Sequence, residues 1–156
     1  MFEELTHADL VQRARRWLLS ARRCGVVVTE FATWSCSEIP DALGFTKEHS
    51  VLIECKISRA DFFADAKKDF RRCPEKGLGN YRFYLCPAGM IKPAELPAPW
   101  GLVYVNGEKS RQVKPAQFCV ANPKHERAIL LSIARRAELR GFMAEICKPL
   151  ERNEWQ

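Results

Sequence analysis

Two acidic side chains and a lysine in the first third of the chain lie at a spacing that could support chemistry on phosphates. Asp41 is followed thirteen residues later by Glu54, and Lys56 comes two residues after Glu54. In a strand, alternate side chains point to the same face, so Glu54 and Lys56 would lie side by side. A buried strand between helical layers is normally apolar on both faces. The charged pair breaks that rule, and such departures tend to fall at functional sites.

A polar, turn-like segment at residues 46–50 separates Asp41 from Glu54. This turn would join two neighbouring strands, expected at 39–45 and 51–57, so that Asp41 approaches Glu54 across the sheet. Two carboxylates a few ångströms apart repel each other, and a divalent cation removes that cost. Mg²⁺ favours one or two protein carboxylates together with water and phosphate oxygens. The pattern therefore predicts a metal site beside an amine.

The surrounding pattern predicts the elements that must position these residues. Helices are expected at 7–23, 58–72 and 123–147, and strands at 26–34, 39–45, 51–57, 81–87 and 101–105. Thr6 and Ser58 are expected to cap the first two helices. The final helix is expected to bury its apolar residues, Leu131 and Leu139 among them. This order predicts an α/β fold, a mixed sheet flanked by helices.

Composition limits the class of protein. The chain has 156 residues, enough for a single domain spanning 1–156, and 25 Lys and Arg against 19 Asp and Glu give a net charge of +6. This basic excess is compatible with a polyanionic partner. No apolar run reaches the length of a membrane span, so no membrane association is expected. Seven scattered cysteines without a CxxC pair indicate free thiols in a reducing cytoplasm.

Pro40-Asp41 followed by Glu54-Cys55-Lys56 resembles the motif of the PD-(D/E)XK nuclease superfamily. The family core order, α-β-β-β-α-β, matches the elements expected between residues 7 and 87. The tract IECKISRADFFADAKKDF also looks like the MmcB-like DNA-repair branch of that superfamily. The resemblance implies a restriction-endonuclease-like fold. It also implies hydrolysis of nucleic-acid phosphodiesters with Mg²⁺ or Mn²⁺.

The resemblance also implies roles for individual residues. Asp41 and Glu54 would be metal ligands, and the carbonyl of Cys55 would be a third. Lys56 would position or deprotonate water and stabilise the developing charge. Glu30, in the first predicted strand, is a further candidate ligand, although a structural or surface role is the favoured interpretation for it.

Basic and aromatic residues supply candidate nucleic-acid contacts. Phosphate contacts are expected from a basic face on the helix after the motif, formed by Lys67, Lys68, Arg71 and Arg72, unless this face is simply solvated. Trp34 could stack on bases, although packing is the favoured interpretation. The arginines of the last helix are expected to be solvated, and the three histidines are expected at the surface.

We therefore expect a metal-dependent deoxyribonuclease that acts in bacterial DNA repair or phage nucleic-acid processing in the cytoplasm. RNA is open as a substrate, and a homodimer is open because double-strand cutters of this fold are often dimers. One alternative is a catalytically inactive module of the same fold that binds nucleic acid or a protein partner, for example in defence or anti-defence. Another is an unrelated α/β enzyme in which Glu54 and Lys56 form a structural ion pair and Asp41 is a turn residue.

Overall fold

Six strands form one mixed sheet in the computed structural model, which describes residues 5–151 and 154. The strands, in chain and spatial order, are β1 (Val26–Thr29), β2 (Ala42–Phe45), β3 (Ser50–Cys55), β4 (Tyr81–Pro87), β5 (Gly101–Asn106) and β6 (Lys109–Lys114). β1, β2 and β3 are antiparallel neighbours, β3, β4 and β5 run parallel, and β6 returns antiparallel to β5. The predicted mixed sheet is confirmed.

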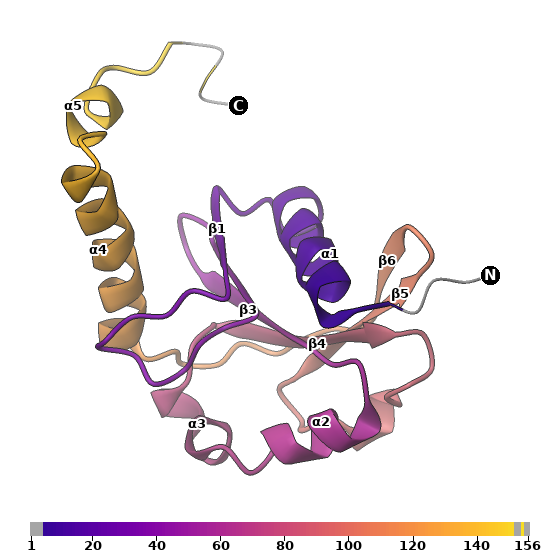
Figure 1. The fold of residues 1–156 in the computed structure, drawn as a ribbon. Helices are drawn as coiled ribbons and strands as arrows, with labels where there is room; N and C mark the ends of the chain where they lie inside the picture. The colour runs from indigo at the N-terminus through magenta and orange to yellow at the C-terminus, as the bar shows by residue number, and fades with distance from the viewer. Residues whose placement is uncertain (1–4, 152–153, 155–156) are drawn as a thin grey trace.

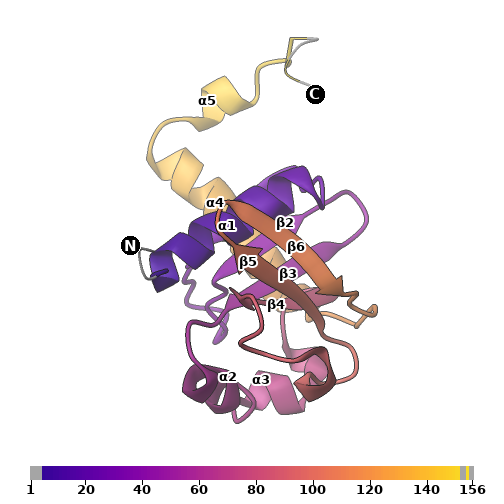
Figure 2. The same ribbon diagram turned by 90° about the vertical axis from the view of Figure 1, so that its right-hand side faces the viewer.

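Helices cover the sheet unevenly. They are α1 (His7–Ser20), α2 (Arg59–Asp65), α3 (Asp69–Arg72), α4 (Pro123–Leu139) and α5 (Met143–Ile146), with short 3₁₀ turns at Pro74–Lys76 and Pro93–Glu95. Figure 1 shows α1 on one face of the sheet and α2 and α3 beyond the other. Figure 2 shows α4 and α5 leading away from this body. The predicted order of helix, three strands, helix and strand is confirmed, with the second helix split in two.

The two faces of β3 pack against different layers, as its alternating pattern predicts. Val51, Ile53 and Cys55 join the apolar core beneath α1. Leu52 joins the second core, on the side of α2, and Glu54 is also buried. A strand buried on both faces must satisfy any charge within the protein. Glu54 therefore requires partners from neighbouring elements.

Local signals placed the helix starts correctly. The hydroxyl of Thr6 accepts a hydrogen bond from the backbone N–H of Asp9. The backbone N–H of Thr6 donates in return to the carboxylate of Asp9, so α1 begins with a capping box. The side chain of Ser58 accepts from the backbone N–H of Asp61 at the start of α2. These caps satisfy amide groups that a helix start otherwise leaves without partners.

Several element ends differ from the sequence prediction. β1 stops at Thr29 because Glu30 takes a left-handed backbone conformation, with φ 47°. The helix expected at 58–72 breaks before α3, where Lys68 is extended. Gly141, with φ 75°, separates α4 from α5. β6 was not predicted because its mainly polar sequence shows no alternation, and its pairing with β5 supplies the missing constraint.

Two predictions from composition can be compared directly with the fold. None of the helices in the described part of the chain is both long enough and apolar enough to cross a membrane. All seven cysteines are free thiols, and four of them are buried. The absence of a disulfide framework follows the prediction made from their scattered spacing.

Candidate active site at the ends of β2 and β3

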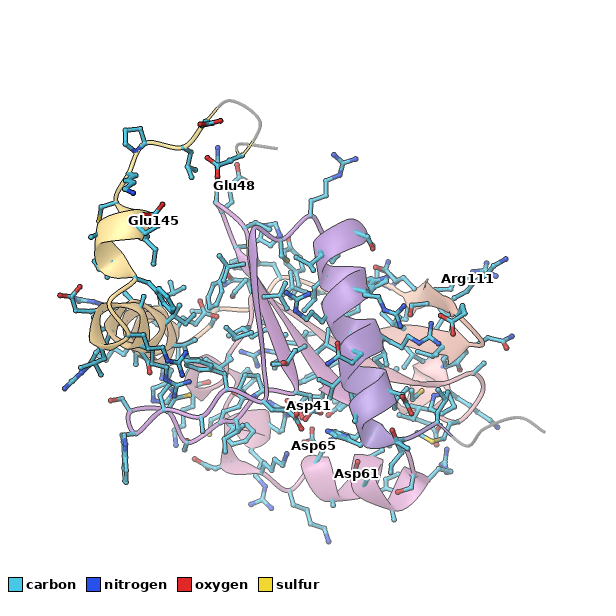
Figure 3. All side chains as sticks on the ribbon, turned by 45° about the horizontal axis from the view of Figure 1, so that its top comes forward. Asp41, Glu48, Asp61, Asp65, Arg111 and Glu145 are labelled. Atoms are coloured by element: carbon cyan, nitrogen blue, oxygen red, sulfur yellow. The ribbon has the colours of Figure 1, made fainter. Side chains whose placement is uncertain are left out.

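The β2–β3 pairing brings Asp41 to Glu54. Ala42 is the partner of Ile53 in this antiparallel pair, so continuing the register by one residue sets Asp41 opposite Glu54. The backbone N–H of Cys55 donates a hydrogen bond of 2.7 Å to Oδ2 of Asp41. Two acids that are far apart in sequence therefore meet at the same end of the hairpin. Figure 3 labels Asp41 together with Asp61 and Asp65 of α2, which lie below it in that view.

Beside Asp41 lies a group of charged side chains that are at most 4% exposed, here called the ionic cluster. It consists of Glu38, Glu54, Lys56, Asp65 and Arg71. Nζ of Lys56 lies 3.6 Å from Oε2 of Glu54 and 3.4 Å from Oδ1 of Asp65. The backbone N–H of Lys56 donates to the carbonyl of Leu85, which fixes this residue just beyond the end of β3. The structure thus places the predicted carboxylate and amine next to each other.

Arg71 lies inside the ionic cluster. The prediction that it faces solvent and contacts phosphates is therefore wrong. Its Nε donates a hydrogen bond of 2.8 Å to Asp65, its Nη2 lies 3.1 Å from Glu54, and its Nη1 binds Glu38. The guanidinium also stacks on the ring of Trp100 at 4.8 Å. The break between α2 and α3 removes the continuous helix on which the exposed face was predicted.

Lys67, Lys68 and Arg72 remain at the surface, as the prediction requires of phosphate contacts. Lys68 is the one that borders the ionic cluster, because its Nζ lies 2.7 Å from Oδ1 of Asp65 and 4.0 Å from Oε2 of Glu54. Its side chain is part exposed and part in contact with buried carboxylates. It is therefore the cation best placed to connect solvent with the interior of the site.

Two residues of the site were missed by sequence reasoning. The carboxylate of Glu38 accepts a hydrogen bond of 2.7 Å from the backbone of Leu78 and pairs with Arg71. His7, predicted at the surface, has Nε2 3.4 Å from Oδ1 of Asp41. No local signal separates a buried loop acid such as Glu38 from a solvated one. For His7, the start of α1 was predicted but not its approach to the hairpin.

Glu30 is near Asp41 but does not lie on a strand. Its backbone N–H donates to the carbonyl of Asp41 at 3.2 Å, and its carboxylate lies 3.8 Å from Nε2 of His7. The side chain is 61% exposed. The prediction that Glu30 lies in the first strand is therefore wrong. Its left-handed backbone ends the strand and directs its carboxylate to His7.

The carboxyl groups of the site differ in how readily they ionise. Burial raises the pKa of Glu54 to about 7, with the guanidinium of Arg71 limiting the rise. Burial also raises the pKa of Asp41, against the hydrogen bond from Cys55. Burial acts in the same direction on Asp65, but Arg71 and Lys68 outweigh it and hold the pKa of that carboxyl below its usual range. Asp65 is thus the fixed anion, whereas Glu54 would gain from another cation.

The donors present fit a hard divalent cation held largely through water. Within the described residues, no set of three or more His, Cys, Asp or Glu side chains is arranged to hold a metal. The side-chain ligands would be the two carboxylates that the β2–β3 register brings together, Asp41 and Glu54. Oε1 of Glu54 is buried and accepts no hydrogen bond, although Nη2 of Arg71 forms an ion pair with it at 3.1 Å. Two carboxylates are within the usual number for Mg²⁺.

The charge balance also favours a dication. The carboxylates that interact here are Glu38, Asp41, Glu54, Asp61 and Asp65, and the cations are Lys56, Lys68 and Arg71. When all of these groups are ionised, five negative charges face three positive ones, and His7 beside Asp41 adds a fourth positive charge when it is protonated. A divalent cation would offset the remaining negative charge.

Comparison with known proteins supports the fold and assigns no activity. No family model matches the chain, and no curated protein matches it. Among solved structures, it is similar to a protein of unknown function from Silicibacter pomeroyi, with 28% sequence identity and a TM-score of 0.61. The similarity covers 95% of this chain and 99% of that one, so it extends over nearly the whole α/β fold.

Proposed function

We propose that the protein is a divalent-metal-dependent nuclease that hydrolyses DNA phosphodiester bonds at the ends of β2 and β3. The observation that carries the proposal is the meeting of Asp41 and Glu54 beside the amine of Lys56. The order of the elements around them is the one that the PD-(D/E)XK resemblance implies. A repair or phage-processing role and a cytoplasmic setting belong to the same proposal.

Asp41, Glu54 and the carbonyl of Cys55 would hold Mg²⁺ or Mn²⁺. When bound, such an ion polarises a phosphate oxygen and lowers the pKa of water. The hydrogen bond from the Cys55 N–H engages Oδ2 of Asp41 and so orients its carboxylate, which leaves Oδ1 as the oxygen that would bind the ion. His7 lies beside that oxygen, 3.4 Å away, and helps to fix it.

Lys56 is the residue that would contact the reacting phosphate or its water. Glu54 and Asp65 hold its ammonium group from the buried side. A weaker contact, 3.7 Å, reaches the half-exposed Asp61. A substrate phosphate could replace Asp61 there without disturbing the two buried contacts. Lys68, at the rim, would then add a second positive charge.

A binding module without catalysis is the second candidate, and one observation favours it. Arg71 and Lys56 lie 3.1 Å and 3.6 Å from the carboxylate of Glu54, so its charge is already countered within the chain. Such pairing counters the buried charge of Glu54 without any metal. The protein would then hold nucleic acid or a protein partner on the same scaffold. The two candidates differ in one respect that can be measured, metal-dependent cleavage.

The decisive measurement compares cleavage of nucleic acid by the parent protein and by the Asp41→Asn variant. Fluorescently labelled single- and double-stranded DNA, with RNA in parallel, is incubated with the purified protein in Mn²⁺, Mg²⁺ or EDTA. We expect metal-dependent cleavage of DNA, and a loss of at least about 100-fold in rate for Asp41→Asn. Glu48→Gln is the matched control because Glu48 is exposed and lies far from Asp41 (Figure 3). Its rate should equal that of the parent protein.

Calorimetric titration with Mn²⁺ separates the two candidates further. The parent protein should bind Mn²⁺, and Asp41→Asn should weaken binding at least about tenfold with an unchanged melting temperature. Equal cleavage by the parent and Asp41→Asn would place the activity elsewhere or in a contaminant. DNA binding without cleavage or Mn²⁺ binding would identify the binding module.

A further inference from the structure

A groove of about 450 Å³ lies between residues 33–35 and the outer face of α4, and it is lined by residues other than those of the ionic cluster. Trp34 lines it and is fully exposed, contrary to the packing interpretation. Leu131 and Leu139, which were predicted to be buried, line it from α4 and are 64% and 76% exposed. Figure 1 shows the β1–β2 loop passing the foot of α4. The groove thus presents a large aromatic ring and an apolar floor to solvent.

The charged residues that line this groove are all basic. Arg136 donates a hydrogen bond of 3.0 Å to the carbonyl of Ala32, and its guanidinium stacks on the ring of Phe31 at 4.0 Å. It therefore fixes the loop against α4. Arg135 also lines the groove and has no hydrogen-bond or ion-pair partner within the described residues. Among the described residues, no acidic side chain lines the groove, so a negatively charged ligand would meet no opposing charge from them.

The same loop connects the groove to the proposed active site. The hydrogen bond from Glu30 to Asp41 closes the base of the loop, and Trp34 lies in its outer part. A ligand lying along the loop would extend from the groove toward Asp41. This continuity indicates a long polymer as the ligand. The required features are a polyanionic backbone and flat rings.

We propose that this groove binds a single-stranded segment of nucleic acid. Trp34 stacks on a base, Arg135 contacts a phosphate, and the backbone of the same strand continues along the loop. Stacking on an exposed aromatic side chain beside arginine is a common, sequence-tolerant mode of single-strand binding. This inference deepens the proposed function. It rests on that function in one respect, because the bound strand is taken to continue to the proposed active site at Asp41.

Charge argues against a second copy of the chain as the occupant. Pairing α4 with itself would bring together the basic residues Lys124, Arg127, Arg135 and Arg136 of both copies. The acids available on α4 to offset them are Glu126 and Glu138. Glu126 already accepts hydrogen bonds from Ser50 and from the backbone of Gly79. Like charges at such an interface repel, whereas a polyanion would neutralise them.

Binding of a labelled oligothymidine in EDTA tests the proposal separately from cleavage. Fluorescence anisotropy gives the dissociation constant, and quenching of tryptophan reports stacking. Trp34→Ala should raise the dissociation constant about tenfold. Arg135→Ala should lower the slope of log affinity against log salt by about 0.7. Arg111→Ala is the matched control, because Arg111 is exposed on β6, on the opposite side of the molecule from α4 (Figure 3). It should leave affinity within about twofold.

Two results would overturn the proposal. One is an unchanged affinity and salt slope in both Trp34→Ala and Arg135→Ala. The other is a concentration-dependent dimer in sedimentation that Leu131→Ser dissociates, which would assign the groove to a second copy. Failure of the nuclease proposal looks different: the parent binds and Trp34→Ala does not, yet no DNA is cleaved in Mn²⁺. Conversely, Asp41-dependent cleavage together with unaltered binding by both Trp34→Ala and Arg135→Ala would support the nuclease proposal and reject the role of the groove.

Discussion

The ionic cluster and the outer face of α4 depart from the ordinary distribution of residues in opposite directions. The cluster withdraws five charged side chains almost completely from water. The outer face of α4 leaves Leu131 and Leu139 largely in water. Charges in the cluster have partners from the β1–β2 loop, β3, α2 and α3. The leucines have no equivalent cover within the described residues.

In the ionic cluster, the chain itself supplies the partners of the buried groups. On the outer face of α4, the exposed apolar groups would have to be covered by another molecule. A buried charge is tolerated only when other groups of the protein satisfy it, and here those groups are present. Covering an exposed apolar surface with a ligand removes it from water and lowers the free energy of the system. The cluster therefore belongs to the internal construction of the proposed active site. The groove on α4 is the surface that we propose for recognition.

Removing the central cation of the cluster should have the largest effect on stability. Arg71→Met would leave Glu38, Glu54 and Asp65 buried with one cation fewer, and we expect a loss of about 3–5 kcal/mol in the free energy of unfolding. Urea denaturation measures it. Arg72→Met, one position along and exposed, is the control and should change stability by less than about 0.5 kcal/mol. A loss below about 1 kcal/mol for Arg71→Met would mean that the cluster is open to water.

The two sides of α4 should respond very differently to truncation. Ile129 is completely buried against the second core, so Ile129→Ala should cost about 3 kcal/mol. Leu131→Ala, on the groove side, should cost less than about 0.5 kcal/mol in the free protein. Thermal and urea unfolding of both variants would test the contrast. Comparable losses would show that the outer face of α4 is covered in solution.

Glu54→Gln should reveal the strain of keeping a carboxylate in the cluster. The folded-state pKa of Glu54, about 7, lies above its ordinary value of 4.5. Its contribution to stability is therefore fully present below about pH 4.5 and is lost as the pH rises through 7. The variant should gain on the parent by on the order of 2 kcal/mol between about pH 5 and pH 8. Glu48→Gln should show no such trend, and a parallel trend in both would reject the assignment.

Much of the scaffold around the site followed from local patterns. The polar turn between β2 and β3 and the alternation in β3 predicted the meeting of Asp41 and Glu54, because strand pairing has a fixed register. Thr6 and Ser58 marked helix starts because a cap acts within three residues of itself. These features depend on interactions between near neighbours or directly paired strands.

Other features of the site could not be predicted in this way. The hydroxyl of Tyr84 donates to Asp65 from β4, nineteen residues away. Glu38 meets Arg71 across thirty-three residues, and His7 meets Asp41 only because α1 crosses the sheet at that end. In each case the partner is set by how whole elements pack, which no local pattern encodes.

The sequence alone determined the α/β order, the hairpin and the adjacency of an acid and an amine at the end of β3. Tertiary structure alone decided which charges are buried, turning Arg71 inward and bringing in Glu38, and which apolar residues stay in water along α4. The physical reason is the distance along the chain over which each interaction acts. Backbone conformation and strand register are fixed by neighbouring residues, whereas the burial of a side chain depends on the sum of all the elements that pack around it.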